Sequence, residues 1–307
     1  MKIVVVGSGA MGCLFGGLLA ESGQDVVSID IAGRHLEALQ RDGLVLRTDA
    51  GERHIAVTAG LAADFSAPCD LALVFTKGPH TATAVRDAAH LIGPQSWVLT
   101  LQNGLGNAAT IQQVVPHVRV AIGMTSWPAD LHAPGHAASH GHGGVLLWSH
   151  DGRPDPALER IAAVLSAAGL NAAADASVEV AIWEKVAFNA GMNSVCAVTL
   201  LPVGPMGDHP AGPSLAHAIV AEALAVARAR GLAVDAARVE RLIATAFAEH
   251  RTHRPSMLQD VLAGRPTEIE TINGAIVAEG ERLGIATPVA RTLRDLVRLI
   301  DFRNAMS

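Results

Sequence analysis

The stretch GSGAMG, residues 7–12, places three glycines at the spacing G-x-G-x-x-G between an apolar run and a helical pattern. The preceding run, KIVVV, has the composition of a buried strand, and the residues that follow carry a helical pattern. A strand that turns into a helix through this motif is typical of the first βαβ unit of a doubly wound parallel sheet. This motif therefore constrains the fold more than any other stretch.

The rest of the chain divides into a half with strand signals and a half without them. The runs DVVSID, LALVF, WVLTL, VRVAIGM and GGVLLW alternate with Ala- and Leu-rich segments, and residues 154–168 are predicted to form a helix. After about residue 172 strand signals nearly vanish, and helical spacing is predicted over 175–199, 213–231, 234–250 and 267–302. We predict an α/β fold with a Rossmann-type doubly wound sheet in residues 1–172, then an all-helical substrate and catalytic domain in residues 173–307. The site is expected in a cleft between the two.

The charge and the cysteines exclude several functions. The net charge of −6, without a dense Lys and Arg cluster, provides no basic field for nucleic acid. No secretion signal and no stretch of about 18 apolar residues is evident, so we expect no membrane span. Cys13, Cys69 and Cys196 lack C-x-x-C spacing, which argues against a disulfide framework and fits a reducing cytoplasm.

Four histidines lie close together in the sequence, and they invite a metal-site interpretation. Pro134 and the neighbouring glycines interrupt any helix that could align metal ligands, so we expect a solvated turn and hairpin and no metal. The four are His132, His136, His140 and His142.

The glycine motif predicts a dinucleotide site. Its glycines allow a tight turn, close approach of the backbone to a pyrophosphate, and close helix packing. Asp30 ends the second predicted strand, where a carboxylate can accept hydrogen bonds from the adenosine ribose and would repel a 2′-phosphate. We therefore expect NAD(H) in preference to NADP(H), although Arg34 lies near enough to leave NADP(H) open. The expected cofactor residues here are Gly7, Ser8, Gly9, Ala10, Met11, Gly12 and Asp30.

A polar stripe marks the segment WEKVAFNAGMN, residues 183–193. In a helix, Lys185, Asn189 and Asn193 lie at i, i+4 and i+8, so they share one face. The chain contains no tyrosine and no cysteine cluster, which excludes a Tyr-based short-chain dehydrogenase and a zinc alcohol dehydrogenase. Lysine is then the leading proton donor to an alkoxide formed by hydride transfer, whereas a structural ion pair of Lys185 with Glu268 is the alternative.

The chain resembles the ketopantoate reductase (2-dehydropantoate 2-reductase, PanE/ApbA) family over nearly its whole length. The resemblance rests on GSGAMG, TKGPHT (76–81), QNGLGN (102–107), WEKVAFNAGMN and PSMLQDVLAGRPTEIETING (255–274), in the family's order. It implies an oxidoreductase that reduces the 2-oxo acid 2-dehydropantoate to (R)-pantoate, a step of pantothenate biosynthesis. A homodimer is one candidate assembly.

The resemblance also implies roles for single residues. Lys185 would be the general acid, and Glu268 would orient it and contact substrate or cofactor ribose. Asn189 and Asn193 would hold substrate oxygens, and Ser256 the substrate carboxylate. The remaining positions, Asn103 and Lys77, would lie near the nicotinamide and the cofactor phosphates.

Two departures from the family leave the reaction open. Many members use NADPH and carry a basic residue where this chain has Asp30, and SVCAV after Asn193 lacks a proline common there. One alternative is therefore an NAD-dependent β-hydroxyacid or other 2-hydroxy acid dehydrogenase. Another is a module that binds NAD as a sensor without catalysis. At the residue level, Ser256 could instead be a helix N-cap, and Asp260 with Arg265 is expected to be a structural pair.

Overall fold

The computed structural model describes residues 1–306 and divides into two compact units. The first comprises Met1–Gln102 and Asn107–Val178, and the second comprises Asn103–Gly106 and the chain from Glu179 onwards. Residues 103–106 thus group with the second unit although their neighbours in the chain belong to the first.

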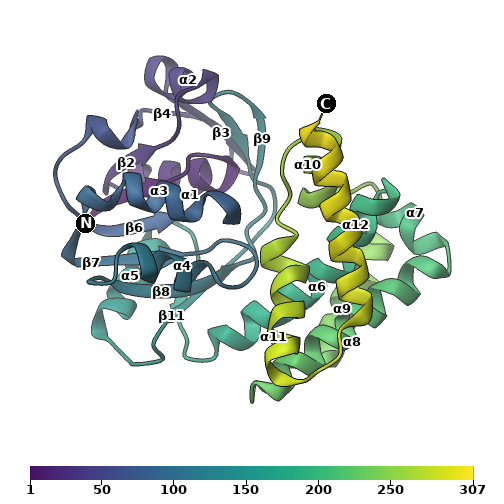
Figure 1. Cartoon of the computed structure of the whole chain (residues 1–307). Helices are drawn as coiled ribbons and strands as arrows, with labels where there is room; N and C mark the ends of the chain where they lie inside the picture. Colours follow the sequence, from purple (N-terminus) through teal and green to yellow (C-terminus); the bar gives the residue numbers. More distant parts are fainter. Residues whose placement is uncertain (307) are drawn as a thin grey trace. The chain divides into compact units, whose positions relative to one another are not determined.

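An eight-stranded sheet forms the centre of the first unit (Figure 1). Its strand order is β12-β11-β8-β7-β6-β1-β2-β5, and every neighbouring pair is parallel except β11 with β8. The predicted mostly parallel Rossmann-type sheet is confirmed. The strands are β1 (Lys2–Val6), β2 (Asp25–Ile29), β5 (Thr58–Gly60), β6 (Cys69–Val74), β7 (Ile92–Thr100), β8 (Arg119–Thr125), β11 (Val145–Ser149) and β12 (Ala172–Ala174).

Helices cover both faces of this sheet, and β1 shows why the sequence requires it. Successive side chains of a strand point to opposite faces, so a run without polar residues needs a cover on each side. Ile3 and Val5 pack into one buried cluster, and Val4 and Val6 pack into another. The helices are α1 (Ala10–Glu21), α2 (Arg34–Asp42), α3 (Thr81–Asp87), α4 (Asn107–Val114) and α5 (Pro156–Ala167), with 3₁₀ turns η1 (Ala62–Asp64), η2 (Gly78–His80) and η3 (Ala89–Leu91).

A second, four-stranded sheet has the order β4-β3-β10-β9, and the sequence patterns did not anticipate it. Its strands are β3 (Leu44–Thr48), β4 (Gly51–Ile55), β9 (Asp130–Ala133) and β10 (His136–Ala138). β9 and β10 pair antiparallel around a turn at Gly135, whose φ is +73°, which confirms the predicted hairpin in the histidine-rich segment. No group of three or more His, Cys, Asp or Glu side chains within residues 1–306 is arranged to hold a metal ion.

The regular elements among the described residues of the second unit are all helices, as predicted. Its helices are α6 (Val178–Thr199), α7 (Val203–Asp208), α8 (Ala211–Ala229), α9 (Ala236–Glu249), α10 (Ser256–Leu262), α11 (Ala275–Leu283) and α12 (Pro288–Ala305), with a π-helical segment, η4 (Glu270–Gly274), before α11. The helical spacing predicted over residues 267–302 is present, but it is divided between η4, α11 and α12. Gly284, with φ of +70°, ends α11, and Pro288 starts α12.

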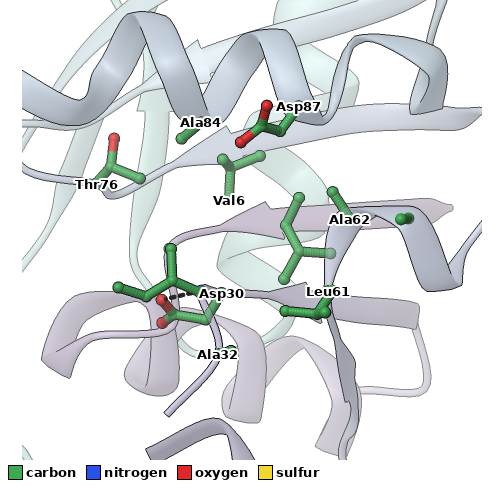
Figure 2. Close-up of a pocket in the computed structure, with 12 residues that line it drawn as sticks. Val6, Asp30, Ala32, Leu61, Ala62, Thr76, Ala84 and Asp87 are labelled. Carbon is green, nitrogen blue, oxygen red and sulfur yellow. Dashed lines mark hydrogen bonds between the residues drawn. The ribbon is translucent and has the colours of Figure 1, made fainter.

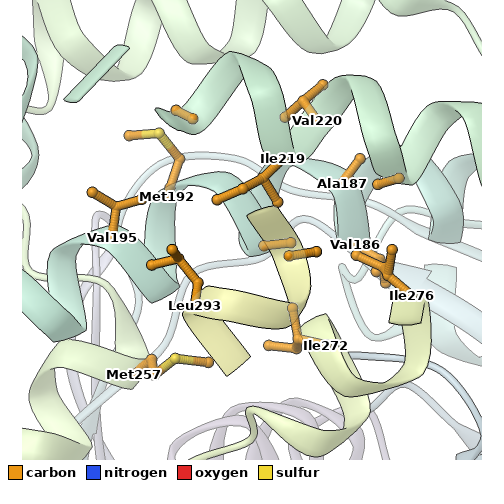
Figure 3. Packing of buried hydrophobic residues seen from close by; sticks show 14 of the residues in the cluster. Val186, Ala187, Met192, Val195, Ile219, Val220, Met257, Ile272, Ile276 and Leu293 are labelled. Carbon is orange, nitrogen blue, oxygen red and sulfur yellow. The ribbon is translucent and has the colours of Figure 1, made fainter. Parts of the chain in front are cut away.

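The core of the second unit is built around α6. Figure 3 shows Val186 and Ala187 of this helix packed among Ile219, Ile272 and Ile276 from three other segments. Cys196 is fully buried in the same cluster, as expected for a small core residue, and burial raises its pKa to about 12. None of the helices formed by residues 1–306 combines the length and the apolar character that crossing a membrane requires.

Candidate cofactor and active site

The three glycines after β1 are required for different reasons. Gly7 has φ of +94°, and a Cβ there would lie 2.9 Å from the Thr76 nitrogen. A Cβ on Gly12 would lie 2.0 Å from the Gly7 carbonyl oxygen, so only glycine allows the close turn. A Cβ on Gly9 would meet nothing within 4 Å. Protein packing therefore does not explain Gly9, whereas a ligand close to the backbone would.

Helix α1 begins directly after Gly9 and offers its N-terminus to that open space. The first N–H groups of a helix have no partner within the helix, and the helix dipole adds positive potential there. No acidic side chain lies in the first turn of α1 to neutralise that potential. Ala10 and Met11 lie at the start of this turn, and their role at a pyrophosphate stays a prediction.

Asp30 follows the end of β2 and contacts the glycine loop. Its Oδ2 accepts a hydrogen bond of 2.8 Å from the Ser8 N–H, and its Oδ1 accepts one of 2.8 Å from the Ile31 N–H. A carboxylate oxygen can accept more than one hydrogen bond, so Asp30 can also accept from a ribose hydroxyl. The bond to Ser8 was not foreseen from the sequence.

A cavity of about 440 Å³ opens at the carboxyl ends of β1, β2 and β6, beside Asp30 (Figure 2). This is where the strand order reverses and where open α/β sheets bind ligands. Asp30 and Asp87 are its charged residues, and no Lys or Arg is among the lining residues. The lining consists of Val6, Gly7, Ile29, Asp30, Ile31, Ala32, Leu61, Ala62, Ala63, Thr76, Ala84 and Asp87. The lining is therefore mainly apolar, with two carboxylates and no cation.

The loop after β6 carries Lys77 and is fixed by a residue that the sequence interpretation missed. Gln102 donates from Nε2 to the Thr76 carbonyl at 2.5 Å and to the Thr81 hydroxyl at 2.7 Å. Lys77 lies between these anchors as the residue before η2, partly buried. Gln102 directly precedes Asn103 in the segment QNGLGN, and this position is the sequence signal that could have identified it.

The polar stripe of α6 exists as predicted, because residues 178–199 form one continuous helix. Lys185 and Asn189 are partly buried, and Asn193 is 5% exposed. Neighbouring residues Val186 and Ala187 point into the core. The helix therefore holds one amine and two amides on a single face, against a packed apolar face.

Burial lowers the pKa of Lys185 from 10.5 to about 8, and the negative charge of Glu268 opposes this by raising it. Burial disfavours the ammonium form because it removes water from the charge, whereas a carboxylate nearby favours it. Lys185 thus remains mostly protonated at neutral pH yet can lose its proton more readily than an ordinary lysine. This pair also fits the structural alternative, since ion pairs perturb pKa values in the same way.

Glu268 is 9% exposed. Side chains of α12 form hydrogen bonds with residues that precede and follow Glu268 in the chain. Thr267 donates from its hydroxyl to Asp301 Oδ2 at 2.7 Å, and Arg298 Nη2 donates to Glu270 Oε2 at 2.7 Å. Arg298 and Asp301 are three residues apart, so they share a face of α12. The sequence analysis missed Arg298 and Asp301, because charged residues on a helix pattern are usually exposed surface residues.

Ser256 is exposed and is the first residue of α10, with Pro255 in the N-cap position and no side-chain capping bond. The alternative that Ser256 serves as the N-cap was therefore wrong, because the helix begins one residue earlier than that role requires. The structural pair was confirmed: Arg265 Nη2 lies 2.9 Å from Oδ1 of Asp260, whose side chain is 3% exposed.

Asn103 belongs to the segment of four residues that groups with the second unit. Leu105 donates from its N–H to the Thr271 carbonyl at 2.8 Å, and a Cβ on Gly104, whose φ is +86°, would lie 2.4 Å from the same oxygen. The segment is thereby fixed against Thr271 of η4, which lies three residues after Glu268. The predicted site residues of the second unit are thus Asn103, Lys185, Asn189, Asn193, Ser256 and Glu268.

The parallel sheet, the glycine loop and the acidic pocket at the strand ends define a Rossmann-type dinucleotide-binding protein. The chain belongs to the ketopantoate reductase PanE/ApbA family. The family's N-terminal model matches residues 3–152, and its C-terminal model matches residues 177–301.

Relatives in two domains of life share the full length. A 2-dehydropantoate 2-reductase of Streptococcus pyogenes serotype M18 is 34% identical over 298 residues, covering 97% of each chain. One of Halobacterium salinarum is 36% identical over 303 residues, covering 97% of this chain and 98% of the relative. The protein is therefore an oxidoreductase, and the sensor alternative is set aside.

Solved structures show the same fold. D-mandelate dehydrogenase with NADH and anilino(oxo)acetate has a TM-score of 0.93 at 31% identity, covering 99% of this chain and 100% of that one. A PanE/ApbA family ketopantoate reductase from Ralstonia eutropha JMP134 has a TM-score of 0.91 at 31% identity, with the same coverage.

Proposed function

We propose that this protein catalyses the NAD(P)H-dependent reduction of 2-dehydropantoate, a small 2-oxo acid, to (R)-pantoate. Family membership and the names of the full-length relatives support this reaction. The observation that carries the mechanism is the placement of the partly buried Lys185 amine on a helix face shared with Asn189 and Asn193. Burial there lowers the pKa of Lys185 to about 8. A general acid works best when its pKa lies near the working pH.

In this proposal Lys185 is the catalytic acid. Its Nζ donates a proton to the substrate's keto oxygen, and its charge stabilises the negative charge that develops there. Glu268 favours the ammonium form and orients it. The amides of Asn189 and Asn193 hold substrate oxygens, and Ser256 holds the substrate carboxylate. A bound NAD(P)H would supply the hydride.

We further propose that residues 1–172 bind the cofactor and residues 173–307 supply substrate and catalytic groups. The glycine loop, residues 7–12, holds the pyrophosphate through backbone N–H groups, and Asp30 holds the adenosine ribose. Lys77 and Asn103 act near the phosphates and the nicotinamide. NAD(H) is preferred over NADP(H), because a 2′-phosphate would meet carboxylates and no cation in the pocket. Assembly as a homodimer stays a prediction.

A second candidate reaction is the oxidation of a 2-hydroxy acid with NAD. Two observations favour it: Asp30 lies in the pocket where a 2′-phosphate would bind, and the fold matches a D-mandelate dehydrogenase in complex with NADH at a TM-score of 0.93. The same residues serve both directions, because a group that donates a proton in reduction accepts it in oxidation.

The test is kcat/KM of the purified protein for 2-dehydropantoate with NADH and with NADPH. A panel of branched and aromatic 2-oxo acids, and D-mandelate with NAD, is measured alongside. We expect 2-dehydropantoate with NADH to give the highest value. Failure to reduce any 2-oxo acid with either cofactor would contradict the reductase proposal, and turnover of D-mandelate alone would replace it with the second candidate. Lys185→Ala serves as the inactive control.

A further inference from the structure

We propose that His35 is a positioning residue for the cofactor, because it fixes the direction of the Gly9 N–H in the pyrophosphate loop. The proposal deepens the cofactor binding proposed above and rests on it. His35 lies on α2, outside the glycine motif, and nothing in its sequence neighbourhood marks it as part of the site.

The Ser8 carbonyl explains why a side chain is needed here. Ser8 is 1% exposed, and it precedes the first residues of α1, so its carbonyl oxygen is not part of the helix. A buried carbonyl requires a hydrogen-bond donor. His35 Nε2 lies 2.6 Å from this oxygen, and the Cys13 thiol donates to it at 3.0 Å.

The protonation of the two ring nitrogens of His35 follows from its second contact. Gly135 donates its N–H to His35 Nδ1 at 3.1 Å, so Nδ1 accepts and carries no proton. The proton of the neutral ring is then on Nε2, which donates to the Ser8 carbonyl. The ring thereby connects the glycine loop to the turn of the β9–β10 hairpin.

The geometry of the Ser8–Gly9 peptide determines which way the Gly9 N–H points. The structure contains no cis peptide among residues 1–306, and in a trans peptide the C=O and N–H groups point in opposite directions. Holding the Ser8 carbonyl toward His35 therefore turns the Gly9 N–H away from it. The Cβ position of Gly9 is open for 4 Å, as a bound pyrophosphate would require.

Two other contacts complete the arrangement. Asp30 holds the Ser8 N–H, which fixes the preceding peptide plane. The Cys13 thiol is the weaker partner of the Ser8 carbonyl, because a thiol is a weak donor. Burial raises the pKa of Cys13 to about 12, so the thiol keeps its proton and remains a donor. His35 is accordingly the main group that sets the orientation of the Ser8–Gly9 peptide.

Three substitutions at one position separate the two hydrogen bonds of His35. Glutamine places an N–H donor near the position of Nε2, and asparagine places an acceptor near the position of Nδ1. His35→Gln therefore retains the bond to Ser8, His35→Asn retains the bond from Gly135, and His35→Ala removes both. His117→Gln, at an exposed histidine of the same unit, is the matched control.

The experiment measures the Kd of NADH and of ADP-ribose by titration, and kcat at saturating NADH. For His35→Ala and His35→Asn we expect both Kd values to rise roughly 2- to 10-fold, the factor for one ordinary hydrogen bond, with kcat within about twofold of wild type. His35→Gln and His117→Gln should bind within about twofold of wild type.

Unchanged affinity in His35→Ala would overturn the proposal. So would affinity retained by asparagine but lost by glutamine, because that pattern would assign His35 to the hairpin alone. A wild-type protein that binds no NADH would instead contradict the proposed cofactor function, so the two failures are distinguishable.

Discussion

Replacing Lys185 by methionine should slow catalysis strongly and at the same time stabilise the protein at neutral pH. Burial holds the pKa of this amine at about 8, against 10.5 for an ordinary lysine. A pKa change of one unit corresponds to about 1.4 kcal/mol, so holding the ammonium form in the folded protein at pH 7 costs about 3 kcal/mol of stability. Solvent reaches the partly buried side chain and reduces this cost. We therefore expect Lys185→Met to raise the free energy of unfolding by about 1–3 kcal/mol at pH 7.

The sign of this effect depends on pH. Between about pH 8 and 10.5 the unfolded chain holds a proton on Lys185 that the folded chain has lost, so the stability contributed by this group rises with pH. The advantage of the methionine variant should be fully present below about pH 8 and should vanish toward pH 10.5. Removal of the general acid should lower kcat by roughly 10² to 10⁴ at pH 7.

Urea unfolding followed by circular dichroism at pH 7 and pH 10, together with steady-state kinetics, tests both expectations. Lys2→Met, at another of the three lysines of the chain, is the matched control and should change neither quantity appreciably. A methionine variant with more than about a tenth of wild-type kcat would remove Lys185 from its catalytic role. A variant that is less stable at pH 7 would show that the amine is held chiefly as one half of a structural ion pair.

Three further predictions concern the pH profile and the cofactor loop. In the direction of reduction, kcat should fall as pH rises through about 8, because Lys185 loses the proton it donates; a flat profile to pH 10 would contradict this. The double variant Asp30→Ser, Ile31→Arg should raise the ratio of kcat/KM for NADPH over NADH roughly tenfold or more. An unchanged ratio would show that the pocket does not select the cofactor; Asp25→Asn, at the exposed start of β2 and outside the pocket lining, is the control. Gly9→Ala should weaken NADH binding with little change in thermal stability. Gly12→Ala should lower the free energy of unfolding by about 1–3 kcal/mol, because its Cβ meets the Gly7 carbonyl. Equal effects of the two variants on stability would refute this distinction.

The local placement of several candidate site residues followed from short-range patterns. The glycine spacing after KIVVV, the acidic residue at the end of the second strand and the i, i+4, i+8 stripe of α6 all lie within segments whose periodicity fixes which side chains share a face. The alternation of strands and helices gave the parallel sheet for the same reason. These features depend on backbone geometry that neighbouring residues determine, so the sequence by itself was sufficient.

Tertiary structure alone decided the contacts between distant segments. β3 pairs in parallel with β10, although about ninety residues separate them, and no local pattern predicts that pairing. His35 meets Ser8, and Asp301 of α12 meets Thr267 beside Glu268, through contacts that are equally non-local. The pattern of a surface helix predicts only that such residues are exposed and polar. Which polar groups become buried partners depends on chain packing, because only packing removes water and makes each unpaired group costly.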